Sequence, residues 1–222
     1  LEGLEKIMQR GVENGLEGLK FLDAEETKAI EPNVNCIRSI FVPQAGIIDY
    51  EALCKTLEEQ LKASGVTFLM SMELLDIKRD NKRVLIETNS GQLSSRFLIN
   101  CAGLYADTLA EKCGFELDFR IIPFRGEYYE FKSEFEHLVK HLIYPVPDPR
   151  FPFLGVHFTR MQRGGIEAGP NAVLALKREG YKRLDFNLKE FLEIMTYTGT
   201  LKLGRRHWRK GLDEYYRSFS KK

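Results

Sequence analysis

The chain has 222 residues, 43% apolar and 29% charged, so it carries enough apolar side chains to bury a core and is not a disordered segment. Its 33 basic and 32 acidic side chains nearly cancel, which argues against a nucleic-acid-binding protein, since such proteins normally show a basic excess. No stretch of the sequence approaches the roughly 18 uninterrupted apolar residues of a membrane-spanning helix.

The four cysteines have neither CxxC nor zinc-finger spacing. We therefore expect no disulfide framework and no metal site, and we place the protein in the reducing cytoplasm. The sequence has no initiator methionine and no secretory leader at its start. We therefore expect a processed chain or a part of a longer protein.

Helical patterns dominate the first part of the chain. Apolar side chains at steps of three and four predict a helix within residues 1–18. Asp23 followed by Glu26 resembles a capping box for a second, short helix. Asp49 is placed to cap a third helix, which carries an apolar ridge of Leu53, Leu57 and Leu61.

The apolar period then changes from 3.6 to 2. Up to residue 100 we predict strands over residues 67–70, 74–79, 83–88 and 96–100, with turns at 80–82 and 89–91. Later strands are predicted over residues 120–122, 127–131, 142–144, 153–159 and 165–168, and a helical tail over 186–219. The predicted fold class is therefore α/β (α+β), with mixed and largely antiparallel sheets.

Small residues mark one candidate ligand contact. The predicted strand 96–100 runs into Cys101, Ala102 and Gly103, after which a helix begins. Small side chains let a ligand phosphate approach the backbone, and a helix start offers free N–H groups. Tight packing between strand and helix explains the same residues equally well.

Three polar residues are further candidates. In a strand, His157 and Thr159 point to the same face, and a histidine is a natural proton acceptor for an alcohol, although a lone strand histidine is more often structural. Arg125 offers a planar fork to a carboxylate, or pairs with Glu127 on the surface. Asn171, in a Gly-Pro turn, caps that turn or donates to a ligand.

Short motifs occur in a fixed order over nearly the whole chain. They are EP at 31–32, VP at 42–43, GIIDY at 46–50, CAGL at 101–104, PFRGEY at 123–128, IYPVPDP at 143–149, PFLGVHFT at 152–159, GPNA at 169–172, KREGY at 177–181 and Phe186. This ordered set resembles the FAD-dependent oxidoreductases of the D-amino-acid oxidase type, and most closely the L-2-hydroxyglutarate oxidases and dehydrogenases. The pieces at 144–149, 153–159 and 169–172 distinguish that subgroup from the glycine and sarcosine oxidases.

The resemblance implies an internal part of a two-domain enzyme. The sequence contains no GxGxxG after a strand, no P-loop and no GxSxG, so it lacks the family's opening dinucleotide motif, and it also lacks the family's closing segment. The implied domains are a substrate-binding domain at 1–45 and 117–200, a partial FAD-binding domain at 46–116 and a truncated C-terminal helical segment at 201–222. We therefore expect FAD in the full-length enzyme but not in this chain alone.

The implied reaction is oxidation of L-2-hydroxyglutarate to 2-oxoglutarate, in which a base takes the hydroxyl proton and flavin takes a hydride. His157 is the implied base or substrate orienter, and a histidine stretch of the family that this chain lacks is the alternative base. The implied substrate-binding residues are Arg125, Tyr144, Thr159 and Asn171. The implied cofactor-binding residues are Leu74, Cys101, Ala102 and Gly103.

Two alternatives remain open at this stage. One is a related flavoenzyme that acts on glycerol 3-phosphate or an amino acid. The other is a non-catalytic binding module with an oxidoreductase-derived fold. The expected partner is a small 2-hydroxydicarboxylate substrate. We expect no nucleic-acid partner and no transmembrane segment, and the sequence does not say whether the full-length enzyme binds a membrane surface.

Overall fold

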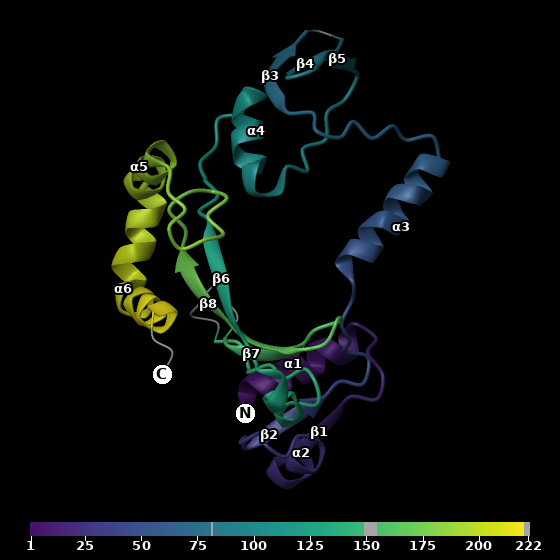
Figure 1. Cartoon of the computed structure of the whole chain (residues 1–222), viewed down its shortest axis with the longest axis vertical. Helices are drawn as coiled ribbons and strands as arrows, with labels where there is room; N and C mark the ends of the chain where they lie inside the picture. The colour runs from purple at the N-terminus through teal and green to yellow at the C-terminus, as the bar shows by residue number, and fades with distance from the viewer. Residues whose placement is uncertain (81, 149–154, 220–222) are drawn as a thin grey trace. The chain divides into compact units, whose positions relative to one another are not determined.

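The computed structural model describes residues 1–80, 82–148 and 155–219 (Figure 1). The chain forms two compact units, the first built from Leu1–Thr56 and Gly126–Ala172 and the second from Leu57–Arg125 and Val173–Lys222. Helices and antiparallel sheets occur together, which confirms the predicted fold class. The domain ranges stay a prediction, because compactness does not report which ligand a unit binds.

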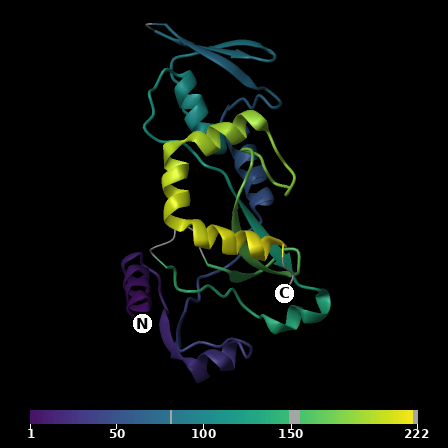
Figure 2. The same ribbon diagram turned by 90° about the vertical axis from the view of Figure 1, so that its left-hand side faces the viewer.

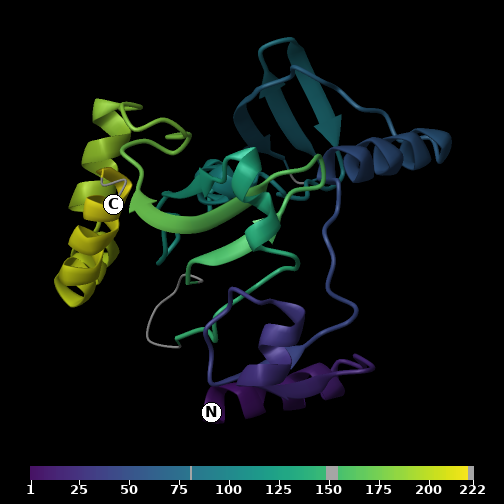
Figure 3. The same ribbon diagram turned by 60° about the horizontal axis from the view of Figure 1, so that its bottom comes forward.

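The first unit begins with two helices and a two-stranded sheet, and the second helix has a capping box. Its elements are α1 (Glu2–Glu13), β1 (Lys20–Asp23), α2 (Ala24–Ile30) and β2 (Arg38–Phe41), and β1 pairs antiparallel with β2. The predicted capping box is confirmed, since the Asp23 carboxylate accepts from the Glu26 N–H at 2.9 Å and Glu26 accepts from the Asp23 N–H at 2.9 Å. Figure 3 shows α2 beside this sheet, where the Thr27 and Ser39 hydroxyls lie 2.7 Å apart.

A buried carboxylate ties this hairpin to a later segment of the same unit. Glu31 follows α2, is 5% exposed and accepts hydrogen bonds from the Lys140 N–H at 3.0 and 3.2 Å. The Nδ1 atom of His141 lies 2.7 Å from the same carboxylate. These contacts hold the chain shortly before Tyr144, a candidate substrate-binding residue.

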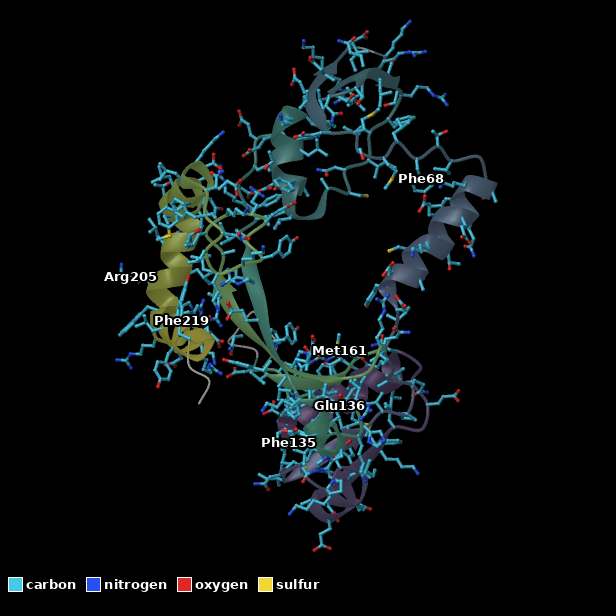
Figure 4. All side chains as sticks on the ribbon, viewed as in Figure 1. Phe68, Phe135, Glu136, Met161, Arg205 and Phe219 are labelled. Carbon is cyan, nitrogen blue, oxygen red and sulfur yellow. The ribbon has the colours of Figure 1, made fainter. Side chains whose placement is uncertain are left out.

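A three-stranded sheet has the order β6–β8–β7 and is formed by β6 (Phe124–Glu130), β7 (His157–Arg160) and β8 (Ile166–Leu174). The β7–β8 pair is antiparallel, and Ile166, at the start of β8, is fully buried. The helix η2 (Ser133–Leu138) follows β6. Figure 4 labels Phe135 and Glu136 of η2 and Met161, which directly follows β7, in a region of the first unit dense with side chains.

The second unit contains a meander of β3 (Leu74–Arg79), β4 (Val84–Thr88) and β5 (Gly91–Ser95). It also contains η1 (Gly103–Tyr105), α4 (Ala106–Lys112), α5 (Leu188–Thr196) and α6 (Thr198–Phe219). Figure 2 shows the sharp bend of α6, which falls at His207, where φ is −125° and ψ is 19°.

Helix α3 (Tyr50–Ala63) has residues in both units. It begins as predicted after Asp49, whose carboxylate accepts from the Glu51 and Ala52 N–H groups.

Four predicted strands are wrong. Residues 67–70, 96–100 and 120–122 form no strand, and residues 142–144 contribute only an isolated bridge at Ile143. Strand β5, which was not predicted, is the third strand of the meander. Phe97 and Ile99 are each 83% exposed, and no other described segment pairs with the backbone there. An apolar run becomes a strand only where a neighbouring strand takes up its backbone hydrogen bonds.

Some predicted features fall partly outside the described residues. These are position 81 of the 80–82 turn and positions 153–154 of the 153–159 strand. Within the described ranges, no helix is both long and apolar enough to cross a membrane. The same ranges hold no group of three or more histidine, cysteine, aspartate or glutamate side chains placed to bind a metal ion.

Candidate functional site

Strand register places two of the predicted site residues, His157 and Thr159, on one face of the β7–β8 pair. His157 pairs with Gly169. Directly opposed residues share a face, and alternate residues along a strand return to it. His157 and Thr159 therefore lie on the face of Gly169 and Glu167, and His157 is only 8% exposed. Asn171, which was predicted to lie in a turn, lies inside β8 and is 5% exposed.

Two tyrosines enclose His157. The bridge between Ile143 and Phe158 brings Tyr144 beside His157, and the two rings stack with centroids 4.6 Å apart and an angle of 26°. Tyr128 of β6 approaches the imidazole edge-on, with centroids 6.3 Å apart and an angle of 77°. Sequence reasoning missed Tyr128, although it is the last residue of the PFRGEY motif that carried the resemblance.

A backbone carbonyl determines which imidazole nitrogen carries the proton. Nδ1 of His157 lies 3.0 Å from the carbonyl oxygen of Gly155. Because a carbonyl only accepts, Nδ1 must be the donor, and in the neutral ring Nε2 then keeps a free lone pair. The ring is therefore oriented to accept a proton at Nε2.

The neighbouring phenol remains a hydrogen-bond donor. Burial raises the pKa of Tyr128 above its ordinary value of 10.0, and the nearby Glu167 and Tyr144 raise it further. Since the shift is upward, Tyr128 keeps its proton through the neutral range. The His157 cluster (Tyr128, Tyr144 and His157) thus brings two phenol rings against one imidazole.

Glycine at position 169 leaves the space that the Tyr128 ring occupies. A Cβ built there would lie 2.6 Å from Cδ1 of Tyr128 and 2.9 Å from the backbone oxygen of Glu127. We expect Gly169→Ala to lower the free energy of unfolding by about 1–3 kcal/mol, because the strand backbone has to shift. Urea titration measures the loss.

Gly46→Ala is the matched control for that substitution. A Cβ at Gly46 meets nothing within 4 Å, so we expect a change within about 0.5 kcal/mol. Equal stability of both variants would mean that the close packing over Gly169 is not needed.

Arg125 belongs to the second unit and already has backbone partners there. Its NH1 group donates to the carbonyl oxygens of Gly180 at 3.2 Å and Lys182 at 3.1 Å. These contacts hold the end of the KREGY motif and the residue that follows it. The predicted contact of Arg125 with a substrate carboxylate stays a prediction, as do the roles of the other candidate residues.

The small-residue turn (residues 101–105) contains the predicted cofactor contacts Cys101, Ala102 and Gly103. Asn100 shapes it, because its Oδ1 accepts from the Ala102 N–H at 3.1 Å and its Nδ2 donates to the Ala106 carbonyl at 2.8 Å. Gly103 has φ of +52°, and a Cβ there would meet nothing within 4 Å. An open backbone surface of this kind fits a cofactor that lies close to the chain.

Leu74, the remaining predicted cofactor contact, is the first residue of β3 and is half-buried. Next to it, the Lys112 ammonium of α4 donates to the Leu75 carbonyl at 2.5 Å. This hydrogen bond links the start of the meander to the helix that follows the small-residue turn. A backbone contact at Leu74 stays a prediction.

A buried ion pair between Arg178 and Asp107 lies next to the small-residue turn. Arg178 donates from NH1 and NH2 to the two carboxylate oxygens of Asp107 at 2.7 and 2.8 Å, and their side chains are 10% and 3% exposed. Sequence reasoning missed this pair, since its members lie 71 positions apart and no local pattern joins them. The only available signal was that Arg178 lies in the KREGY motif.

The charge of Asp107 is stabilised within the fold. Burial by itself raises its pKa, but the Arg178 hydrogen bonds and the backbone N–H groups of Ile121 and Thr108 outweigh burial and lower the pKa from 3.8 to about 2. A depressed carboxyl pKa contributes stability that is present above the unfolded value and lost as the pH falls through the folded value.

The pH dependence of stability tests this contribution. We expect wild type to exceed Asp107→Asn in unfolding free energy by a constant amount above about pH 5, and this excess to shrink as the pH falls from about 5 to about 2. Urea titrations of both proteins across that range measure it. A difference that does not change with pH would contradict the assigned shift.

Comparison with known proteins identifies the class. The family model described as FAD dependent oxidoreductase matches residues 1–212. The chain therefore belongs to the FAD-dependent oxidoreductase family, as the resemblance predicted.

Similar curated proteins include L-2-hydroxyglutarate dehydrogenases. The one from Indibacter alkaliphilus is 47% identical over 99% of this chain and 55% of its own length. The one from Escherichia coli K12 is 39% identical over 100% of this chain and 52% of its own length. The human mitochondrial one is 36% identical over 97% of this chain and 49% of its own length. The chain thus spans about half the length of the curated relatives it matches.

Solved structures support the fold alone. Glycine oxidase from Bacillus cereus superposes with a TM-score of 0.60 at 19% identity, over 92% of this chain and 53% of that one. L-proline dehydrogenase from P. horikoshii superposes with a TM-score of 0.51 at 17% identity, over 90% of this chain and 54% of that one.

Proposed function

We propose that the protein containing this chain is an FAD-dependent oxidoreductase that converts L-2-hydroxyglutarate to 2-oxoglutarate. The observation that carries the proposal is the 47% identity to an L-2-hydroxyglutarate dehydrogenase over 99% of the chain. The His157 cluster supports it, because oxidation of a hydroxy acid requires a group that accepts the hydroxyl proton.

His157 is proposed to take that proton at Nε2, while its Nδ1–H stays on the Gly155 carbonyl. Asn171 and the Tyr144 hydroxyl donate hydrogen bonds to substrate oxygens, Thr159 lines the same face as His157, and Arg125 is the proposed cation for a carboxylate. When bound, FAD supplies the acceptor for the hydride from the alpha carbon. Loss of one proton and one hydride turns the alcohol into the ketone.

The residues of the small-residue turn and Leu74 are proposed to hold part of FAD through their backbone. By themselves they offer no phosphate loop, so we expect this chain, purified alone, to be colourless. Absorbance near 450 nm in the purified chain would contradict that expectation. A cytoplasmic location is proposed from the four free cysteines.

The substrate proposal is tested with the full-length protein. Reduction of its flavin is followed under anaerobic conditions with L-2-hydroxyglutarate, its D enantiomer, glycerol 3-phosphate, glycine and proline. We expect the highest kcat/KM for L-2-hydroxyglutarate, with 2-oxoglutarate formed in equal amount. Faster turnover of glycerol 3-phosphate or an amino acid would favour the related flavoenzyme, and no turnover at all would favour a binding module.

A further inference from the structure

Arg178 contacts the small-residue turn directly as well as Asp107. Its NH1 group donates to the carbonyl oxygen of Leu104 at 2.6 Å, besides its bond to Asp107. Leu104 lies in η1, and Asp107 lies in the first turn of α4. One buried guanidinium therefore binds the backbone of the turn and the helix that follows it.

Arg178 is itself held from other directions. Its backbone N–H donates to the Glu190 carboxylate of α5 at 2.6 Å, and its guanidinium lies 5.7 Å from the Tyr105 ring centroid. Asp107 additionally accepts from the Ile121 N–H at 3.0 Å. The position of the guanidinium is therefore set by segments on both sides of it in the sequence.

The turn is open at Gly103, and the contacts that hold it come from Asn100 and Arg178. A Cβ built at Gly103 meets nothing within 4 Å, and φ at this residue is +52°, a conformation that glycine adopts without steric cost. A turn that is open on one side keeps its conformation through contacts on the other side. Among the described residues, Arg178 supplies such a contact through a charge-assisted hydrogen bond.

We infer that Arg178 is a positioning residue for the cofactor: by holding the Leu104 carbonyl, it fixes the small-residue turn in the conformation that binds FAD. This inference rests on the proposed function. Lysine at this position keeps the charge but lacks the planar fork that reaches two carboxylate oxygens and a carbonyl together.

The test uses the full-length protein and measures FAD binding separately from activity. Apoprotein of wild type, Arg178→Lys and Asp107→Asn is titrated with FAD, with flavin fluorescence as the readout, at a temperature where circular dichroism shows all three folded. We expect the Kd for FAD to rise roughly tenfold in Arg178→Lys, the effect of losing one hydrogen bond to a charged group. Asp107→Asn keeps the Leu104 contact and should show a smaller rise, of about threefold.

A matched control and a second readout separate positioning from general stability. Arg120 is another arginine next to α4, and its NH2 group lies 3.9 Å from Oε1 of Glu111. Arg120→Lys should leave the Kd for FAD unchanged. In Arg178→Lys we also expect an altered visible spectrum of the bound flavin, with the KM for L-2-hydroxyglutarate at saturating FAD within twofold of wild type.

The outcomes distinguish this inference from the proposed function. An unchanged FAD Kd and spectrum in folded Arg178→Lys, even with a raised KM, would overturn the positioning role and leave the proposed function standing. If Arg178→Lys does not fold, the double variant Arg178→Met/Asp107→Leu replaces it, because it removes the Leu104 contact without leaving an unpaired buried charge. An unchanged Kd for FAD in this double variant overturns the positioning role. A wild-type protein that binds no FAD would overturn the proposed function and this inference with it.

Discussion

His157→Gln in the full-length protein is expected to lower kcat/KM for L-2-hydroxyglutarate by about 100- to 10,000-fold, the range for removal of a positioned general base. Glutamine occupies a similar volume but cannot accept the hydroxyl proton. The effect should fall on kcat, because proton removal belongs to the chemical step. Steady-state kinetics with an artificial electron acceptor measure it.

His137→Gln is the matched control. His137 also has Nδ1 close to a backbone carbonyl, 2.9 Å from that of Glu134, but it lies exposed on η2. We expect its kcat/KM to stay within twofold of wild type. A loss below tenfold in folded His157→Gln would assign the base to another residue. The next candidate would then be the histidine stretch that the family has and that this chain does not contain.

Arg178→Met is expected to lower the free energy of unfolding by about 3–5 kcal/mol, because it leaves the buried Asp107 carboxylate without its cationic partner. Burial decides the size of this effect, since Asp107 is 3% exposed. Urea titration at pH 7 measures the change.

Two further variants make the stability prediction specific. Lys6→Met breaks the Lys6–Glu2 pair, whose side chains are 64% and 81% exposed, and should cost less than about 1 kcal/mol. Adding Asp107→Leu to Arg178→Met should recover part of the loss, since no unpaired buried charge remains. A loss in Arg178→Met no larger than in Lys6→Met would refute a structural role for the pair.

Local rules accounted for much of the secondary structure. The capping box at Asp23 and the cap at Asp49 involve residues within three positions, so the sequence already contains both partners. The strand 96–100 failed for the opposite reason. Its apolar pattern is genuine, but a strand needs a partner, and Phe97 and Ile99 have none among the described residues.

The candidate site divides in the same way. The period of 2 predicts that His157 and Thr159 share a face, and the β7–β8 register sets them opposite Gly169 and Glu167. The stacking of Tyr144 on His157 required a segment from outside the strand pair, and the approach of Tyr128 required the neighbouring strand β6.

The sequence by itself therefore determined the family, the fold class and most helix starts, because these depend on ordered motifs and on neighbours a few residues apart. Only the tertiary structure decided that Tyr144 stacks on His157, and that Asp107 and Arg178 form a buried pair. Both depend on contacts that chain folding creates: a ring from a separate segment placed on the imidazole, and two charges brought together from 71 positions apart. A one-dimensional pattern does not record such distances.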